Sequence, residues 1–327
     1  MTGRALFAVL LGGLALLAVN GRLLQTIPPG RQHVDLVFAP PMRPHVRDAD
    51  GRWRAPFVYP LAIENRLERR YREDRMRLMP LRWFSEGAIV GVDPAAGHPW
   101  FVLGSDALGR DVYARLVAGA RFSLGVALVA AGGALLAGTA IGAIAGFAGG
   151  WASAALMRLA DVVIALPILY VVLTLRAALP LVLTTGQVFW VMVLVFAVVG
   201  WPLVARAVRS VVMVENAREY AESARAIGAS RTRILIRHLL PASGGILLTQ
   251  TTLLVPAFIL AEATLSFVGL GFSEPIPSWG LMLQEASRGH ALVETPWLLA
   301  PAGAIAGTIL FLNWGLRTRR TRANQAA

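Results

Sequence analysis

The chain has 327 residues, of which 56% are hydrophobic and 15% are charged, whereas soluble domains carry about 25% charged residues. This composition excludes an ordinary soluble protein and predicts a membrane protein. The lack of cysteine excludes disulfides, thiolate metal sites and thiol nucleophiles, and the net charge of +12 rests on 31 basic residues that are all arginine, which indicates a coding bias.

Six apolar stretches are long enough to cross a bilayer, which needs about 20 residues per helix. The first runs from Ala5 to Gly21 and has no A-x-A-type cleavage site, so it is interpreted as an uncleaved span rather than a signal peptide. The next stretch, from 122 to 157, holds one helix and a short Gly-Gly-Trp turn. The remaining spans are expected near residues 159–179, 188–205, 244–267 and 296–316. The predicted fold is an all-α membrane protein with six transmembrane helices.

Arginine in short loops predicts the orientation of the spans. The loop from 206 to 237 has seven arginines and three glutamates, whereas the loop from 268 to 295 has one arginine and three glutamates. This places both termini in the cytoplasm and predicts four regions. They are a first transmembrane helix (1–21), a long external segment that ends in an interfacial helix (22–121), a five-helix core (122–316) with a cytoplasmic loop at 206–241, and a cytoplasmic tail (317–327).

The external segment is unusually rich in arginine for that side of a membrane, but long segments translocate largely regardless of their charge. Its charged run "ENRLERRYREDRMR", residues 64–77, is expected to be a solvated helix flanked by loops. Acidic residues interleave with the arginines of this run. No nucleic-acid partner is therefore expected.

The loop between the fourth and fifth spans predicts two short helices joined by a tight turn. Helix-forming and mostly small residues run from Asn216 to Ile227, and Gly228 can end that helix in the left-handed conformation. Ser230 can cap a second helix that extends to about Leu240. Pro241 then restricts the chain where it re-enters the membrane.

The same loop resembles the E-A-A-x-x-x-G…L-P signature of ATP-binding-cassette importer permeases. In that family the segment is the coupling helix, which docks into a groove on a cytoplasmic ATPase. Ser223 replaces the usual first alanine, and His238 stands where the signature has an apolar residue. The resemblance implies an ATPase-coupling role for Ala221, Glu222, Ser223, Ala224, Arg225, Gly228 and Ala229, with Leu240 and Pro241 at the end of the loop.

Three further stretches support the resemblance. The first, "LGSDALGRDVYARLVAGARFSL" (103–124), resembles a pattern of dipeptide and oligopeptide permeases, and similar matches cover 149–167 and 261–283. In the first stretch, Ser105 or Asp106 is expected to cap an interfacial helix with an apolar stripe at Leu108, Val112 and Leu116. Asp111 and Arg115 are expected to pair along that helix. The C-terminus, "NWGLRTRRTRANQAA", departs from the family pattern.

The resemblance implies a type I importer permease fold and a set of partners. The chain is identified as a member of the dipeptide/oligopeptide/nickel family and as the second, C-type permease of a pair. It has no G-x-x-x-x-G-K-[ST] loop. ATP and Mg²⁺ are therefore expected on a partner ATPase, and no cofactor or catalytic residue on this chain. The other expected partners are a homologous second permease, an external solute-binding protein and the lipid of a bacterial inner membrane.

Two features inside the spans have less specific interpretations. Gly138, Gly142 and Gly146 recur on one helix face, which favours close helix packing over a substrate groove. Glu262 lies within the fifth span, where it is either part of a substrate pathway or a solvated or hydrogen-bonded carboxylate. The five histidines lack metal-ligand spacing, so no metal site is expected.

Three readings of the function remain open at this point. The leading one is import of di- or oligopeptides, and nickel or a nickel chelate is the nearest alternative for the same machinery. An ion-coupled secondary transporter is the alternative from another class, although it would predict inverted repeats that are not evident in the sequence. An intramembrane enzyme is a distant third, because no hydrolase motif is present.

Overall fold

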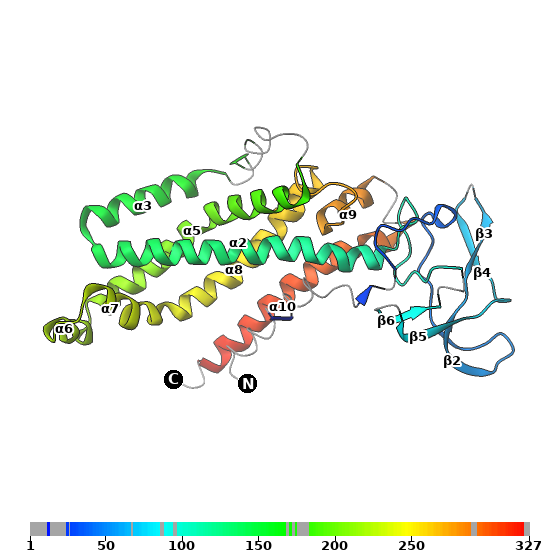
Figure 1. Cartoon of the computed structure of the whole chain (residues 1–327), viewed down its shortest axis with the longest axis horizontal. Coiled ribbons are helices and arrows are strands. Elements are labelled where there is room, and N and C mark those ends of the chain that lie inside the picture. Colours follow the sequence, from blue (N-terminus) through cyan, green and yellow to red (C-terminus); the bar gives the residue numbers. More distant parts are fainter. Residues whose placement is uncertain are drawn as a thin grey trace. The chain divides into compact units, whose positions relative to one another are not determined.

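A computed structural model describes residues 12–13, 24–25, 27–66, 68–85, 88–93, 97–167, 170–171, 174, 183–288 and 293–323. The chain divides into two compact units. The central unit comprises residues 126–261, and the terminal unit lies within residues 1–125 and 262–327. Figure 1 shows long helices in both units and small sheets in the terminal unit.

Four helices in the described part of the chain are long and apolar enough to cross a membrane: Val112–Ala148, Thr185–Asn216, Arg231–Phe267 and Pro296–Asn313. They correspond to the second, fourth, fifth and sixth predicted spans. The first predicted span lies outside the described residues except for 12–13. Of the third, the structure describes residues 159–167, 170–171 and 174. Six transmembrane helices therefore remain a prediction.

The central unit packs the second half of α2 (Val112–Ala148) against α5 (Thr185–Asn216). A Cβ added at Gly146 would lie 2.9 Å from the carbonyl oxygen of Arg209. A Cβ added at Gly138 or Gly142 would lie still closer, to Val204 and Ala205 respectively. These glycines therefore allow two helix backbones to approach, which confirms the packing interpretation.

Helix α3 (Gly150–Ala165) adds a further layer to α5 in the same unit. It begins directly after a turn at Gly149, which has a positive φ of 63°. The predicted Gly-Gly-Trp turn is therefore shorter than expected, because Gly150 and Trp151 already belong to α3. Ala160 packs with Trp201 and Ala205 of α5. Asp161 pairs with Arg206, and Arg209 donates to the hydroxyl of Ser153 at 2.7 Å.

The terminal unit contains β-structure that the sequence did not reveal. Strands β1 (His45–Arg47), β2 (Trp53–Val58), β5 (Met79–Ser85) and β6 (Ala88–Val92) form an antiparallel sheet in that order, and β3 (Leu61–Asn65) pairs with β4 (Arg70–Glu73). Their core comprises Leu36, Ala39, Met42, Val58, Leu61, Met79, Trp100 and Phe101. The all-α prediction is therefore wrong for this region.

The charged run at 64–77 is a β-hairpin rather than the expected solvated helix. In β4, exposed Arg70 and Arg72 alternate with half-buried Tyr71 and Glu73. Tyr71 packs against the sheet core. Alternation of exposed and half-buried residues with a period of two is typical of a strand. It is hard to recognise in β4, because the half-buried positions hold one aromatic and one charged residue.

The predicted start of the interfacial helix is wrong, because the chain becomes helical only from Val112, in the first turns of α2. Residues 104–111 form a loop, and Gly104 and Gly109 have positive φ values of 80° and 70° there. The Asp106 carboxylate closes this loop by accepting from the backbone of Leu108 and Arg110, whereas Asp111 accepts from Tyr113 at the start of α2. Leu108 therefore lies outside the helix and forms no stripe with Val112 and Leu116.

The last part of the terminal unit contains two helices that pack together, α9 (Trp279–Ser287) and α10 (Ala300–Ala323). A loop connects them to the preceding helix, α8 (Gly244–Phe267). Met282 and Ala286 of α9 share a core with Val112 and Leu298. Helix α10 extends into the region predicted as a tail, 317–327, as far as Ala323.

Candidate functional site

The predicted helix–glycine–helix segment is present in the central unit. Helix α6 (Glu219–Ala226) is followed by a turn at Gly228, whose φ of 81° is in the left-handed region. The amide of Gly228 donates to the carbonyl of Arg225, and the amide of Ala229 donates to that of Ala224, both at 3.0 Å. These two bonds form a Schellman motif, which satisfies the last carbonyls of the helix.

The second helix of the segment is shorter than predicted and continues without a break into the next span. Ser230 caps α7 (Arg231–Ile234) by accepting from the amide of Arg233 at 3.4 Å. A π-helical turn from Leu235 to Leu239 and a 3-10 turn from Leu240 to Ser243 then lead into α8. Pro241 therefore lies at the start of a helical turn, where the missing backbone N–H of proline costs no hydrogen bond. It does not end the helical segment.

Helix α6 presents two different faces. Ala221 and Ala224 are buried, whereas Glu222, Ser223, Arg225 and Gly228 are exposed and Ala229 is half-buried. The apolar side chain of Ile227 is 86% exposed, directly before the glycine turn. The small buried alanines let α6 pack closely on its own subunit, whereas its opposite face is exposed.

Several contacts fix α6 to the helices on either side of it. The Arg225 guanidinium donates to the carbonyl of Asn216, the last residue of α5, at 3.0 Å. The Tyr220 hydroxyl donates to Glu215 at 2.7 Å. The ring of Tyr220 also lies 6.4 Å from that of His238, which explains how a histidine is accommodated where the family signature has an apolar residue.

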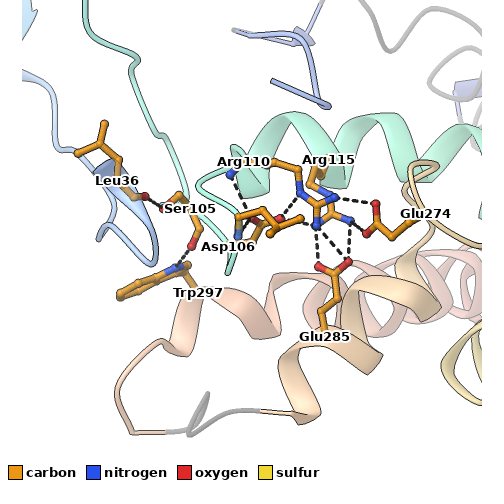
Figure 2. Close-up of polar contacts among 9 residues, drawn as sticks. Leu36, Ser105, Asp106, Arg110, Arg115, Glu274, Glu285 and Trp297 are labelled. Carbon is orange, nitrogen blue, oxygen red and sulfur yellow. Dashed lines mark hydrogen bonds and ion pairs between the residues drawn. The ribbon is translucent and has the colours of Figure 1, made fainter. Parts of the chain in front are cut away.

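A second site, in the terminal unit, is a cluster of five charged side chains. Asp106, Arg110 and Arg115 come from the loop before α2 and its first turn, Glu274 from the loop after α8, and Glu285 from α9 (Figure 2). Arg115, with a side chain 2% exposed, donates to Glu285 at 2.6 Å, to Glu274 at 3.0 Å and to Asp106. Arg110 donates to Asp106 at 2.7 Å and to Glu274 at 2.6 Å.

The cluster contains three carboxyl groups and only two guanidinium groups. Burial by itself opposes ionisation of Glu274, but hydrogen bonds with Glu285 and Arg110 outweigh it and lower the pKa of Glu274 to about 2. Burial raises the pKa of Glu285 instead, and the neighbouring carboxyl of Glu274 acts in the same direction. The pKa values of the two carboxyl groups therefore shift in opposite directions, as expected for neighbouring acids that share the same cations.

This cluster connects segments that are far apart in the sequence. Arg110 is 164 residues from Glu274, and the two contact each other directly. The Asp106 loop is further held by Ser105, whose hydroxyl donates to the carbonyl of Leu36 and whose own carbonyl accepts from the Trp297 indole at 3.0 Å (Figure 2). The cluster therefore fixes the loop after α8 to the start of α2.

Glu262 is fully buried in the terminal unit. Its Oε1 accepts from the Ser266 hydroxyl at 2.7 Å, and Ser123 and Ser278 lie beside the carboxyl group. Oε2 has no hydrogen-bond partner within the described residues. The Ser123 and Ser278 hydroxyls accept from the first amides of α9, those of Trp279 and Leu281. Of the two interpretations of Glu262, the geometry favours a hydrogen-bonded carboxyl that positions α9.

The sequence suggested part of this arrangement and missed the rest. It singled out Asp106, Arg115 and Glu262, but it paired Arg115 with Asp111 rather than with Asp106, Glu274 and Glu285. Glu274 and Glu285 were not recognised, because their partners lie more than 150 residues away. Their only signal was that they are two of the three acidic residues in the stretch from 268 to 295.

Apolar helices long enough to span a bilayer, joined by exposed segments, are typical of a multi-pass membrane protein. The matching family model is the binding-protein-dependent transport system inner membrane component, over residues 138–317, and the chain belongs to this family. It is therefore a transport component without catalytic activity of its own, and this membership decides against an ion-coupled secondary transporter.

Related proteins carry names from peptide transport. A putative peptide permease of Brucella ovis is 39% identical over 222 residues, which cover 67% of this chain and 71% of the relative. The oligopeptide transport system permease protein OppC of Bacillus subtilis is 38% identical over 233 residues, 70% of this chain and 73% of the relative. The glutathione transport system permease protein GsiD of Pectobacterium atrosepticum is 35% identical over 220 residues, 67% and 70% respectively.

Proposed function

We propose that the chain is one permease of a peptide importer and that α6, its glycine turn and α7 dock onto a cytoplasmic ATPase. The observation that carries the coupling role is the Schellman turn at Gly228, which presents Glu222, Ser223 and Ile227 outward. An exposed apolar side chain beside exposed polar ones suits a protein interface, whose centre is apolar and whose rim is polar.

The connections of α6 and α7 suit them to transmit movement. Helix α6 is held to the end of α5 by Arg225, and α7 continues into α8 in one helical stretch from Arg231 to Phe267. A displacement of the docked turn would therefore reach two membrane helices without passing through a flexible linker. The π-helical turn at 235–239 is a local irregularity in that path, of a kind often found at functional sites.

The proposal places the remaining partners as the family implies. The ATPase binds ATP and Mg²⁺ on the cytoplasmic side, a homologous permease completes the pathway, and an external solute-binding protein delivers the cargo. The loop 206–241 and both termini are cytoplasmic, and the sheet region is external, in the membrane of a bacterial cell.

Peptides are the proposed cargo because relatives named for peptide, oligopeptide, dipeptide and glutathione transport share a third or more of their aligned residues with this chain. Peptides differ in their side chains but share backbone N–H and C=O groups. A permissive pathway thus needs few specific contacts. Nickel or a nickel chelate stays the nearest alternative, since the membrane subunit need not coordinate a metal directly.

Calorimetry on the cognate external solute-binding protein tests the cargo. We expect short peptides to bind with dissociation constants of about 1 mM or tighter, which corresponds to at least about 4 kcal/mol. Nickel complexes, measured under the same conditions, serve as the comparison. Heat from nickel chelates with none from any peptide would contradict the peptide assignment and leave the family membership untouched.

A further inference from the structure

A pocket lies between the turn at Val34–Leu36 and the β3–β4 hairpin, in a region to which the proposed function assigns no role. Its volume is about 220 Å³. Val34, Val37 and Ile63 supply its apolar lining, and Asp35, Asn65, Arg66 and Arg69 supply most of its polar lining. It is smaller than the roughly 300–1,000 Å³ of typical ligand pockets. It therefore fits one small group rather than a whole peptide.

The charges that line this pocket favour an anion. Arg66 and Arg69 contribute two positive charges and Asp35 one negative charge, which leaves a surplus of one positive charge. Arg66 pairs with Asp35 at 2.8 Å, but both side chains are about three-quarters exposed. Exposed pairs of this kind contribute little, so Arg66 can exchange its partner for a carboxylate that enters the pocket.

Arg69 stacks on an aromatic ring at the edge of the pocket. Its guanidinium lies 4.6 Å from the centre of the Phe38 ring. Both residues have positive φ values, 52° for Arg69 and 56° for Phe38, although neither is glycine. Strained backbone of this sort persists only where the surroundings impose it, and it clusters at ligand sites. A guanidinium stacked on a ring keeps its planar fork available for a carboxylate.

The wall of the pocket is connected to the charged cluster. The Tyr71 hydroxyl donates to the carbonyl of Val37 at 2.5 Å. Next to Val37, the Phe38 amide donates to the carbonyl of Asp106 at 3.1 Å, and Ser105 bonds with the neighbouring Leu36 and Ala39. A ligand in the pocket would therefore contact a segment that is hydrogen-bonded directly to the loop that contains Asp106 and Arg110.

We propose that this pocket binds a single carboxylate attached to a small apolar group, with Arg69 and Arg66 as its partners. The carboxylate site rests on the geometry of the pocket alone. Its further assignment to the C-terminal residue of a peptide rests on the proposed function. A peptide end supplies one negative charge and one side chain, which matches the surplus charge and the lining of Val34, Val37 and Ile63.

Saturation-transfer NMR on the purified full-length chain in lipid nanodiscs tests the site. The probes are N-acetyl-alanine, its uncharged amide, and acetate. We expect N-acetyl-alanine to bind in the millimolar range and to compete with acetate, and the amide to bind at least about tenfold more weakly, because charge-assisted hydrogen bonds are lost. Arg69→Gln and Arg66→Gln should each weaken binding of the acid. Arg72→Gln, on the exposed face of the same hairpin, should leave it unchanged.

Each result is decisive. Equal binding of the acid and the amide, or binding of the acid that is indifferent to Arg66→Gln and Arg69→Gln, would overturn the carboxylate site. Acetate binding as tightly as N-acetyl-alanine would overturn the assignment to a peptide end, because the apolar lining would then contribute nothing. Calorimetry on the external solute-binding protein tests the cargo separately, so failure of the pocket and failure of the peptide assignment can be told apart.

Discussion

Gly228→Val should reduce transport by at least about tenfold while the amount of folded subunit stays near normal. Gly228 has a φ of 81°, and a Cβ added there would meet nothing within 4 Å. The loss therefore comes from the backbone and not from crowding. A left-handed conformation costs an ordinary residue about 1–2 kcal/mol and a β-branched residue more, and 1.4 kcal/mol is already a factor of ten. Uptake by the assembled importer and the quantity of subunit in the membrane are the two measurements.

Gly228→Asn is the matched control for this substitution. Asparagine tolerates the left-handed conformation better than other non-glycine residues, and the open space accommodates its side chain. We expect transport by this variant to lie close to that of the unaltered chain. Equal transport by the valine and asparagine variants would show that the turn at Gly228 is not needed for coupling.

Arg115→Met should destabilise the subunit by about 3–5 kcal/mol, the usual effect of removing one partner from a buried ion pair. Arg115 contacts all three carboxyl groups of the cluster, and its side chain is 2% exposed. Its removal leaves Arg110 as the one remaining arginine of the cluster, opposite Asp106, Glu274 and Glu285. The unfolding temperature of the purified protein and its yield from membranes measure the effect. Arg121→Met, an exposed position on the same helix, should change neither.

The double variant Arg115→Met with Glu285→Met separates charge balance from simple loss of packing. It removes one positive and one negative charge, so the surplus of one carboxyl in the intact cluster is restored. We expect the double variant to be more stable than Arg115→Met alone, because coupled neighbours are not additive. A double variant that is less stable than either single variant would mean that the cluster is held by packing rather than by charge.

How far the sequence predicts this structure depends on whether the signal is local. Gly228 and Ser230 define the coupling turn through residues within five positions of each other, and the glycine turn and the serine cap are both as predicted. The apolar stretches at 188–205 and 244–267 likewise contain their own signal, and helices α5 and α8 cover them.

Predictions failed where pairing between distant residues decides the structure. The run at 64–77 reads as a charged helix, but β3 and β4 pair across it, and Tyr71 is drawn onto a core made from residues as distant as Phe101. The loop before α2 reads as a capped helix, but Asp106 has to meet Arg110 and Arg115, and its carboxylate closes a turn instead. Neither the strand pairing nor the contacts of Asp106 can be recognised from a local pattern in the sequence.

Photo-crosslinking from Ile227 in the assembled importer tests the central claim most directly, namely that the α6–α7 segment is the contact with the ATPase. The side chain at 227 is 86% exposed, so a photoreactive residue there should not disturb the subunit. The control position is Trp53 in the sheet region, which is 76% exposed. The account predicts a covalent product between position 227 and the ATPase subunit and none from position 53. An intact importer with no ATPase product from 227, or with one from 53, would contradict it.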